Sequence, residues 1–308
     1  MWAAIAKAIS EATSETFELT TKRQVSGGDI NLAYIISNGI SNGHRAINEQ
    51  ANKKPTKQYF VKINRKSNLA LLETEQENLN KIRQLSTIHC PVPITLGTTL
   101  DNSFLVLSFE LLTSPKNDHW YDLGVTLADM HLCSQHGQFG WHQDNYIGQT
   151  LQPNRWQTNW RTFFAEQRIG WQLQLLKEQA VSLGDIEKIT TVCHDLLVHH
   201  KVTPCLVHGD LWQGNVGFAN GKPLIYDPAC YFGDREVDIA MSELFGKFPA
   251  PFYQGYEHTY PLTGGYEQRK LVYNFYHLLN HLLMFGEPYL KQAQEQLELL
   301  LNLNELSQ

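Results

Sequence analysis

The chain has 308 residues, of which 42% are hydrophobic and 18% are charged, so it can bury a large core as one large domain or two of ordinary size. This composition excludes disordered, collagen-like and disulfide-scaffold proteins. The formal net charge of −6 is unevenly spread, because residues 1–113 carry 12 Lys and Arg against 10 Asp and Glu, whereas residues 114–308 carry 13 against 21. This acidic balance disfavours nucleic acid as a partner.

The cysteines and the N-terminal segment favour a reduced, cytoplasmic protein. Five cysteines are an odd number, and none form a C-x-x-C pair, which argues against a disulfide framework and a zinc knuckle. We expect reduced, mostly buried thiols. Residues 1–18 contain acidic residues and no basic start followed by a long apolar run, unlike a signal peptide. The most apolar helical stretch, Leu271–Phe285, is too short and too polar to span a membrane.

The N-terminal third of the chain is rich in predicted strands. Short β-branched or aromatic runs bounded by Gly, Asn, Pro or Asp predict five of them. One helix is predicted over residues 68–85, where apolar side chains recur with helical spacing. The polar connection Asn38–Pro55 is longer than most hairpin loops, and we assign it no chemistry. The predicted strands are Phe17–Arg23, Ile30–Ile36, Gln58–Ile63, Pro93–Thr99 and Ser103–Phe109.

Helices are expected after residue 114. Apolar periodicity predicts helices over residues 118–134, 158–183, 185–200, 237–245, 265–285 and 287–303. The break at Thr113-Ser114-Pro115 places a boundary near Leu111–Lys116. We therefore expect an α+β fold with a small antiparallel-sheet lobe, residues 1–113, and a larger helical lobe, residues 114–308. Four aromatic residues at helical spacing are expected in the core of the second lobe: Trp160, Phe163, Phe164 and Trp171.

The segment Cys205–Asp227, CLVHGDLWQGNVGFANGKPLIYD, carries the strongest chemical signal. Four residues separate Asp210 from Asn215, and two short strands over residues 216–219 and 223–226 follow, joined by an Asn-Gly turn. In such a hairpin the end of the second strand lies beside the beginning of the first. Asp227 is therefore expected close to Asp210 and Asn215, although it lies seventeen residues beyond Asp210.

These oxygen donors suit a hard cation such as Mg²⁺. Their spacing matches a phosphoryl-transfer arrangement in which Asp210 accepts a hydroxyl proton while Asn215 and Asp227 hold metal on nucleotide phosphates. The alternative, that each residue only caps a turn, does not account for their joint spacing. His208 is expected to be buried and to hold the loop by hydrogen bonds. A metal-dependent hydrolase using His208, Asp210 and Asp227 lacks a convincing set of His ligands.

The first lobe should then supply groups that contact phosphates. Gly27 and Gly28 lie between the first two predicted strands, where backbone N–H groups can cover phosphates, although a Gly-Gly pair is also a common turn. Lys62 is a lone cation in the apolar third strand, so its ammonium needs a partner, and Glu75 on the following helix fits. The alternative is that Lys62 extends to solvent.

Three blocks resemble the fructosamine kinase and ketosamine 3-kinase family: HGDLWQGN at 208–215, DPACYFGDREVDIAM at 227–241 and FGWHQDNYIGQTLQPNRWQTNWRTFFAEQRI at 139–169. The resemblance implies a two-lobed protein-kinase-like fold and ATP-dependent phosphorylation of a sugar hydroxyl on a ketosamine. By motif, the resemblance makes Asp210 the base, Asn215 and Asp227 ligands of Mg²⁺, and Lys62 and Glu75 the nucleotide-phosphate pair. Glu110 falls at the hinge where adenine binds, and Asp238 matches an acidic residue that steadies the catalytic loop. Asp29 stands where some members have Cys, so the resemblance does not extend to regulation through a thiol at this position.

Substrate contacts are predicted from the same blocks. Trp212 directly follows the catalytic loop, and Asp144 and Asn145 are further candidates for contact with the sugar or amine. An acid-rich second lobe suits a substrate that carries an amine. The alternatives are a kinase of another small alcohol, of the aminoglycoside or choline kinase type, and a nucleotide-binding regulatory module with negligible turnover. Oligomeric state is left open. The specificity blocks also contain Asn154, Trp156, Trp160 and Arg168.

Overall fold

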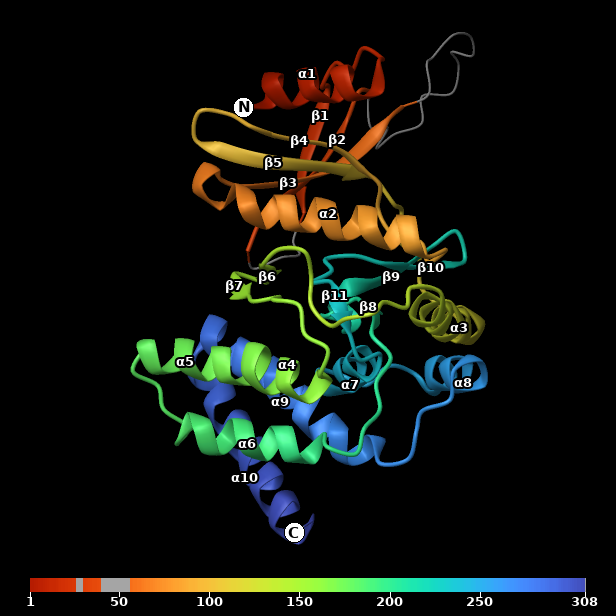
Figure 1. The fold of residues 1–308 in the computed structure, drawn as a ribbon. Coiled ribbons are helices and arrows are strands. Elements are labelled where there is room, and N and C mark those ends of the chain that lie inside the picture. The colour runs from red at the N-terminus through yellow and green to blue at the C-terminus, as the bar shows by residue number, and fades with distance from the viewer. Residues whose placement is uncertain (26–29, 40–55, 308) are drawn as a thin grey trace. The chain divides into compact units, whose positions relative to one another are not determined.

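The computed structural model describes residues 1–25, 30–39 and 56–307 (Figure 1). The chain forms two compact units. The first comprises Met1–Lys81 and Cys90–Leu111, and the second comprises Ile82–His89 and Leu112–Gln308. The two units are described separately below.

Two of the regions singled out in the sequence fall in the gaps. Gly27 and Gly28 lie outside the described residues, as does most of the Asn38–Pro55 connection. Their predicted roles stay predictions.

The first unit is built on a five-stranded antiparallel sheet with the order β1-β2-β3-β5-β4. Lys62 on β3 is paired with Ala33 on β2 and Leu105 on β5, so it lies on the central strand. The predicted strands are confirmed, with β1 displaced a few residues toward the C-terminus. The strands are β1 (Thr21–Val25), β2 (Leu32–Ser37), β3 (Gln58–Arg65), β4 (Pro93–Thr98) and β5 (Asn102–Ser108).

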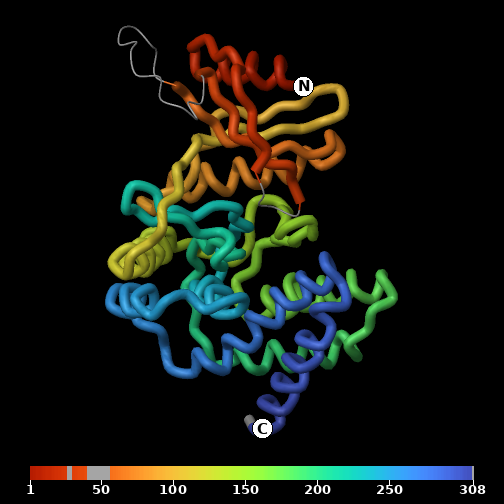
Figure 2. The backbone as a smooth tube through the Cα atoms, turned by 180° about the vertical axis from the view of Figure 1, so that it is seen from behind, coloured from red at the N-terminus to blue at the C-terminus, as the bar shows by residue number. Residues whose placement is uncertain are grey.

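Two helices cover opposite faces of this sheet, as both views show (Figures 1 and 2). Helix α1 (Trp2–Thr13) was not predicted, and it buries Ile5 and Ile9 against alternate residues of the central strands such as Val61 and Val106. Helix α2 (Leu69–Leu85) follows a short 3₁₀ turn, η1 (Lys66–Asn68), as the periodicity predicts. Because side chains alternate along a strand, the residue next to Val61, Lys62, faces away from the α1 core.

The second unit is mainly helical, with three two-stranded antiparallel sheets, β6–β7, β8–β11 and β9–β10. The central helix is α9, against which α5, α7 and α10 pack. The helices are α3 (Asn117–Cys133), α4 (Trp160–Phe164), α5 (Trp171–Glu178), α6 (Ile186–Leu196), α7 (Glu236–Leu244), α8 (Ala250–Thr259), α9 (Tyr266–Phe285) and α10 (Leu290–Ser307). The strands are β6 (Asn145–Ile147), β7 (Thr150–Gln152), β8 (Cys205–Val207), β9 (Val216–Ala219), β10 (Lys222–Ile225) and β11 (Tyr231–Gly233). Short turns η3 (Gln213–Asn215) and η4 (Glu287–Tyr289) complete the unit.

Helix α8 was not predicted, and tertiary packing explains its presence. A side chain at Gly124 on α3 would come closer than 3.0 Å to the backbone of α8, and one at Gly255 on α8 would do the same to the backbone of α3. The two glycines thus let the helices approach at backbone distance. This contact, which leaves no periodic signal in the sequence, contributes to the stability of helix α8.

The single helix predicted over residues 158–183 is interrupted. Helix α4 is followed by a π-helical segment, Ala165–Gly170, and then by α5. Such π-helical segments are rare in proteins, and those that occur are often found at functional sites. The three expected core aromatics on α4 are buried, whereas Trp171 is partly exposed and donates its indole N–H to Leu151 O at 2.8 Å.

All five cysteines are free. Four of them are buried, as expected, and Cys133 is exposed. Among the helices that the structure describes, none has the length and apolar character needed to cross a membrane.

Candidate active site

The site begins where β8 ends, at His208-Gly209-Asp210. Gly209 has a φ of 82°, a left-handed conformation that favours glycine. A Cβ at this position would also come closer than 3.0 Å to the carbonyl oxygen of Ala229. Both the turn and the close approach therefore require glycine beside Asp210.

His208 holds this loop against the next strand. Its Nε2 lies 3.0 Å from Tyr226 O, and its Nδ1 lies 3.3 Å from the backbone N–H of Asp210. Since a carbonyl only accepts and an N–H only donates, the ring is the neutral tautomer protonated at Nε2. Burial lowers the pKa of His208 below its ordinary value, which is consistent with this tautomer. The geometry supports the structural role expected for His208.

Asp238 on α7 fixes the backbone of the same loop. Its carboxylate accepts the N–H of His208 at 2.7 Å and that of Gly209 at 2.8 Å, and His131 Nε2 lies 3.1 Å away. Burial acts to raise the pKa of Asp238, but the hydrogen bond from His131 and the neighbouring histidines hold it below its ordinary value. An ionised Asp238 thus orients two consecutive N–H groups next to Asp210.

The hairpin predicted after Asn215 is confirmed. Strands β9 and β10 pair with Val216 opposite Ile225, and Asn220 and Gly221 form the turn with positive φ angles of 53° and 76°, as an Asn-Gly hairpin turn requires. At the open end, the N–H of Tyr226 donates to Asn215 O at 3.1 Å. The hairpin therefore brings Asp227 back to the start of β9.

Asp210 is the carboxyl group with the most perturbed environment in this loop. Burial, reinforced by the charge of Asp227, raises the pKa of Asp210 to about 7, while a hydrogen bond from Asn215 opposes the rise. Asn215 Nδ2 donates to Asp210 O at 2.8 Å and to Asp210 Oδ2 at 3.1 Å. A carboxyl with a pKa near neutrality is suited to proton transfer.

The donor set fits a hard divalent cation. Within the described residues, Asn215 Nδ2 donates to Asp210, whereas Asn215 Oδ1 accepts no hydrogen bond. Asp227 has a φ of 57°, an uncommon conformation that clusters at functional sites. A carboxamide oxygen and two carboxylates within one loop and hairpin match the oxygen ligands that Mg²⁺ takes together with phosphate.

In the first unit, Lys62 and Glu75 form the predicted ion pair. Lys62 Nζ lies 2.8 Å from Glu75 Oε1 and 2.9 Å from Oε2, and each residue is only 7% exposed. The alternative that Lys62 extends to solvent is wrong, because a buried cation is held by the helix carboxylate. Glu110 lies one residue before the end of this unit, where its Oε1 accepts from Ser108 Oγ at 3.2 Å.

The three predicted substrate residues differ in environment. Trp212 is partly exposed, and its indole covers Gly214, where a Cβ would come closer than 3.0 Å to three ring atoms. Asp144 is exposed and accepts the N–H of Asn154 at 2.8 Å. Asn145 is 2% exposed and bonds three protein groups. Its burial removes it from direct contact with a substrate, which corrects the prediction for this residue.

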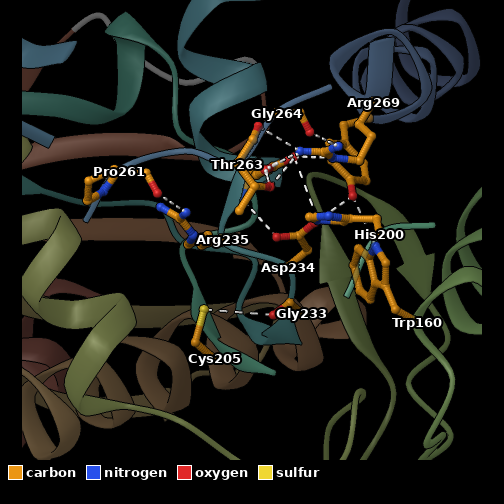
Figure 3. Close-up of polar contacts among 12 residues, drawn as sticks. Trp160, His200, Cys205, Gly233, Asp234, Arg235, Pro261, Thr263, Gly264 and Arg269 are labelled. Carbon is orange, nitrogen blue, oxygen red and sulfur yellow. Dashed lines mark hydrogen bonds and ion pairs between the residues drawn. The ribbon is translucent and has the colours of Figure 1, made fainter. Parts of the chain in front are cut away.

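An ion-pair network anchors the start of α7, the helix that carries Asp238 (Figure 3). Arg269 donates to both carboxylate oxygens of Glu236 at 2.8 Å, and His200 Nε2 lies 2.7 Å from Asp234 Oδ2. One ligand atom each of His200, Asp234 and Glu236 lies within 4.8 Å of the others. Because Arg269 already neutralises Glu236, we interpret this group as a structural network. It was not predicted from the sequence, since its members are far apart along the chain.

Comparison with known proteins assigns the family and the fold. A family model described as fructosamine kinase matches residues 1–303. The chain belongs to this family. A protein of Vibrio vulnificus named a probable ketoamine kinase is 47% identical over 98% of this chain and 100% of its own length. A solved protein of Haemophilus somnus assigned as a fructosamine-3-kinase superposes with a TM-score of 0.88 at 32% identity, covering 98% of both chains.

The kinase also shares its fold with more distant enzymes. An aminoglycoside phosphotransferase superposes with a TM-score of 0.59 at 14% identity, over 96% of this chain and 98% of its own. The predicted protein-kinase-like fold, a small antiparallel-sheet unit and a larger helical one, is confirmed. The chain is an ATP-dependent small-molecule kinase, and its family implies ATP as a substrate.

Proposed function

We propose that this kinase transfers the γ-phosphoryl group of ATP to a hydroxyl on the sugar of a ketosamine, such as a fructosamine or ribulosamine. The observation that carries the proposal is the raised pKa of Asp210, about 7, next to Asn215 and a second carboxylate at the end of the hairpin. The ketoamine kinase name of close relatives supports the acceptor class.

In the proposed reaction, Asp210 orients the sugar hydroxyl and takes its proton as the hydroxyl oxygen attacks the γ-phosphorus in line. The bond from phosphorus to the bridging oxygen of the β-phosphate breaks, and ADP leaves. The hydrogen bond from Asn215 Nδ2 fixes the rotamer of Asp210, so that one oxygen stays available for the proton. Both carboxylate oxygens of Asp238 accept backbone N–H groups of the loop, so Asp238 serves as a positioning residue.

The chain's other polar residues are proposed to handle the nucleotide. Lys62, held by Glu75, would donate to phosphate oxygens, and Asn215 and Asp227 are the residues that would hold Mg²⁺. When bound, Mg²⁺ would neutralise charge on the triphosphate. The backbone at Glu110 is proposed to meet adenine, and the N–H groups of Gly27 and Gly28 are proposed to cover phosphates.

The acceptor site is proposed around Trp212. Its partly exposed indole offers a face on which the amine-bearing part of the substrate can stack, and Asp144, which is exposed, can pair with an ammonium. Binding energy from this non-reacting end can orient the sugar hydroxyl beside Asp210. An amine-bearing ketose should therefore be a better substrate than the free ketose.

The test is a panel of acceptors assayed by ATP consumption, with the new phosphate located by NMR. Ribulose- and fructose-derived lysine adducts are expected to outcompete free ribulose, free fructose and aminoglycosides, with only a weak preference for the smaller sugar. Preference for an aminoglycoside or a free sugar would contradict the ketosamine assignment and leave the kinase assignment intact. ATP binding without turnover on any acceptor would favour a regulatory module.

Variants of the Trp212 contact sharpen the test. Trp212→Ala removes the indole, and Gly214→Ala displaces it, because a Cβ at 214 overlaps the ring. Both are expected to change the ranking of acceptors in kcat/KM. Gly137→Ala is the matched control, because nothing lies within 4 Å of a Cβ at this exposed site. If Trp212→Ala lowered kcat/KM by the same factor for every acceptor, the assignment of Trp212 to specificity would be contradicted.

A further inference from the structure

The β6–β7 hairpin bonds the chain directly after Asp227. Asn145 Nδ2 on β6 donates to Cys230 O at 2.7 Å, and Gln152 Nε2 on β7 donates to Ala229 O at 3.3 Å. The two carbonyls belong to the second and third residues after Asp227. Two amide side chains of one hairpin therefore hold the backbone that follows the proposed metal ligand.

These amides are held in turn by their neighbours. Asn145 Oδ1 accepts from Gln152 Nε2 and from Asn154 Nδ2, both at 2.8 Å. Tyr276 on α9 donates its hydroxyl to Gln152 Oε1 at 2.6 Å. Each of the three amide residues is at most 2% exposed, so water cannot easily replace these hydrogen bonds.

Arg168 in the π-helical segment completes the network. Its side chain is fully buried, and it donates to Asn154 Oδ1 at 2.7 Å and to Pro153 O. The guanidinium carbon lies 4.1 Å from the ring centre of Tyr231 and 4.6 Å from that of Phe163. In the described part of the chain no carboxylate forms an ion pair with it. Because burying such a cation is costly, we interpret Arg168 as a residue that orients its neighbours rather than one that only stabilises the fold.

The segment is also held from the opposite side. Ala229 N–H donates to His208 O at 2.8 Å, and His208 Nε2 donates to Tyr226 O at 3.0 Å. Asp227 therefore lies between residues that are fixed on both sides. A φ of 57° is uncommon for a non-glycine residue, and although Asp tolerates it, Asp populates the extended and right-handed regions more often, so the contacts on both sides select this conformation.

We propose that Asn145, Gln152, Asn154 and Arg168, here called the amide clasp, act as positioning residues that hold Asp227 in its left-handed conformation and so set its affinity for the divalent cation. The inference rests on the proposed function, in which Asp227 is a metal ligand. It also explains why the hairpin residue Asn145 is buried against the metal-binding segment.

The test measures metal binding without turnover. Neutral substitutions of similar size, Asn145→Leu and Gln152→Met, remove the two donors to the segment without adding charge. Trp171→Phe is the matched control, because it removes one hydrogen bond to the same hairpin, at Leu151 O, on a residue that does not bond the segment. Binding of Mn²⁺ in the presence of AMP-PNP is followed by EPR, and binding of AMP-PNP in EDTA is followed by calorimetry.

We expect Asn145→Leu and Gln152→Met to weaken Mn²⁺ binding by about 10- to 100-fold, the usual cost of losing residues that orient a metal ligand. AMP-PNP binding in EDTA should be unchanged, and Trp171→Phe should bind Mn²⁺ like the parent. Asp227→Asn should weaken Mn²⁺ binding most strongly, and adding Asn145→Leu to it should have little further effect.

The outcomes separate the two proposals. If Asp227→Asn leaves Mn²⁺ binding unchanged, the assignment of Asp227 as a ligand fails. If Asp227→Asn abolishes binding while Asn145→Leu and Gln152→Met bind like Trp171→Phe, the amide clasp fails and the proposed function stands. Circular dichroism establishes that each variant is folded at the assay temperature. Unfolding of both clasp variants would assign these residues to the fold alone and overturn the inference.

Discussion

Replacement of Asp210 by Asn tests the proposed base, and the structure sets the expected pH dependence. With the pKa of Asp210 raised to about 7 by burial and by the charge of Asp227, the active carboxylate forms as pH rises. About a tenth is ionised at pH 6 and about nine-tenths at pH 8, so kcat/KM should rise about tenfold between them. This ratio applies with both substrates well below saturation, where kcat/KM reports on the free enzyme. Asp210→Asn should lower turnover by about 10²- to 10⁴-fold.

The assay follows ADP release with a fructose–lysine adduct from pH 5.5 to 8.5, together with ATP binding by calorimetry. The residual rate of Asp210→Asn should lose the limb near pH 7, and its affinity for ATP should persist, because the proposed nucleotide contacts lie elsewhere. A folded Asp210→Asn variant with near-normal turnover would remove Asp210 from the mechanism. If the rise of kcat/KM near pH 7 is unchanged in the variant, that ionisation belongs to another group.

Three further predictions follow from the same contacts. Lys62→Met and Asp227→Ala should lower kcat/KM for every acceptor by a similar factor, and an acceptor-dependent loss in a kinetic panel would contradict their assignment to the nucleotide. Because burial raises the pKa of Asp210 above its unfolded value, the carboxyl destabilises the fold as pH rises from about 4 to about 7. Asp210→Asn should therefore raise the melting temperature at pH 8 but not at pH 4, and an equal change at both would refute this. Gly209→Ala should cost at least about 1–3 kcal/mol in urea unfolding, from its φ of 82° and the backbone overlap, whereas Gly137→Ala should be close to neutral.

The features predicted from the sequence are those with local signals. The hairpin after Asn215 follows from an Asn-Gly turn between two short apolar runs, and its geometry brings Asp227 back as expected. Helix α2 follows from its periodicity, and the predicted pairing of Lys62 with Glu75 follows from a lone cation within the apolar run Tyr59–Ile63. Each of these inferences needs only a short stretch of sequence.

The missed features depend on contacts between distant residues. Helix α8 is stabilised by its backbone approach to α3 at Gly124 and Gly255, a contact with no periodic signature. Strands β6 and β7 have three residues each, and Asn145 meets a carbonyl 85 residues away. A run of buried amides is indistinguishable from a polar loop in the sequence, so Asn145 was assigned to the substrate. The close spacing of Asn145, Gln152 and Asn154 was the available signal.

The backbone at residue 227 restricts how this enzyme can vary. A left-handed φ of 57° is tolerated by Asn and Asp, whose short polar side chains suit it, and is disfavoured for longer or branched residues. The proposed cation site also needs a negatively charged ligand at 227, because its other ligand from this chain, Asn215, is a neutral carboxamide. Glu meets only the chemical requirement and Asn only the conformational one, so Asp alone satisfies both. If codon 227 is randomised and the library is selected for kinase activity, we expect only Asp to be recovered. A screen for folded protein alone should recover Asn as well.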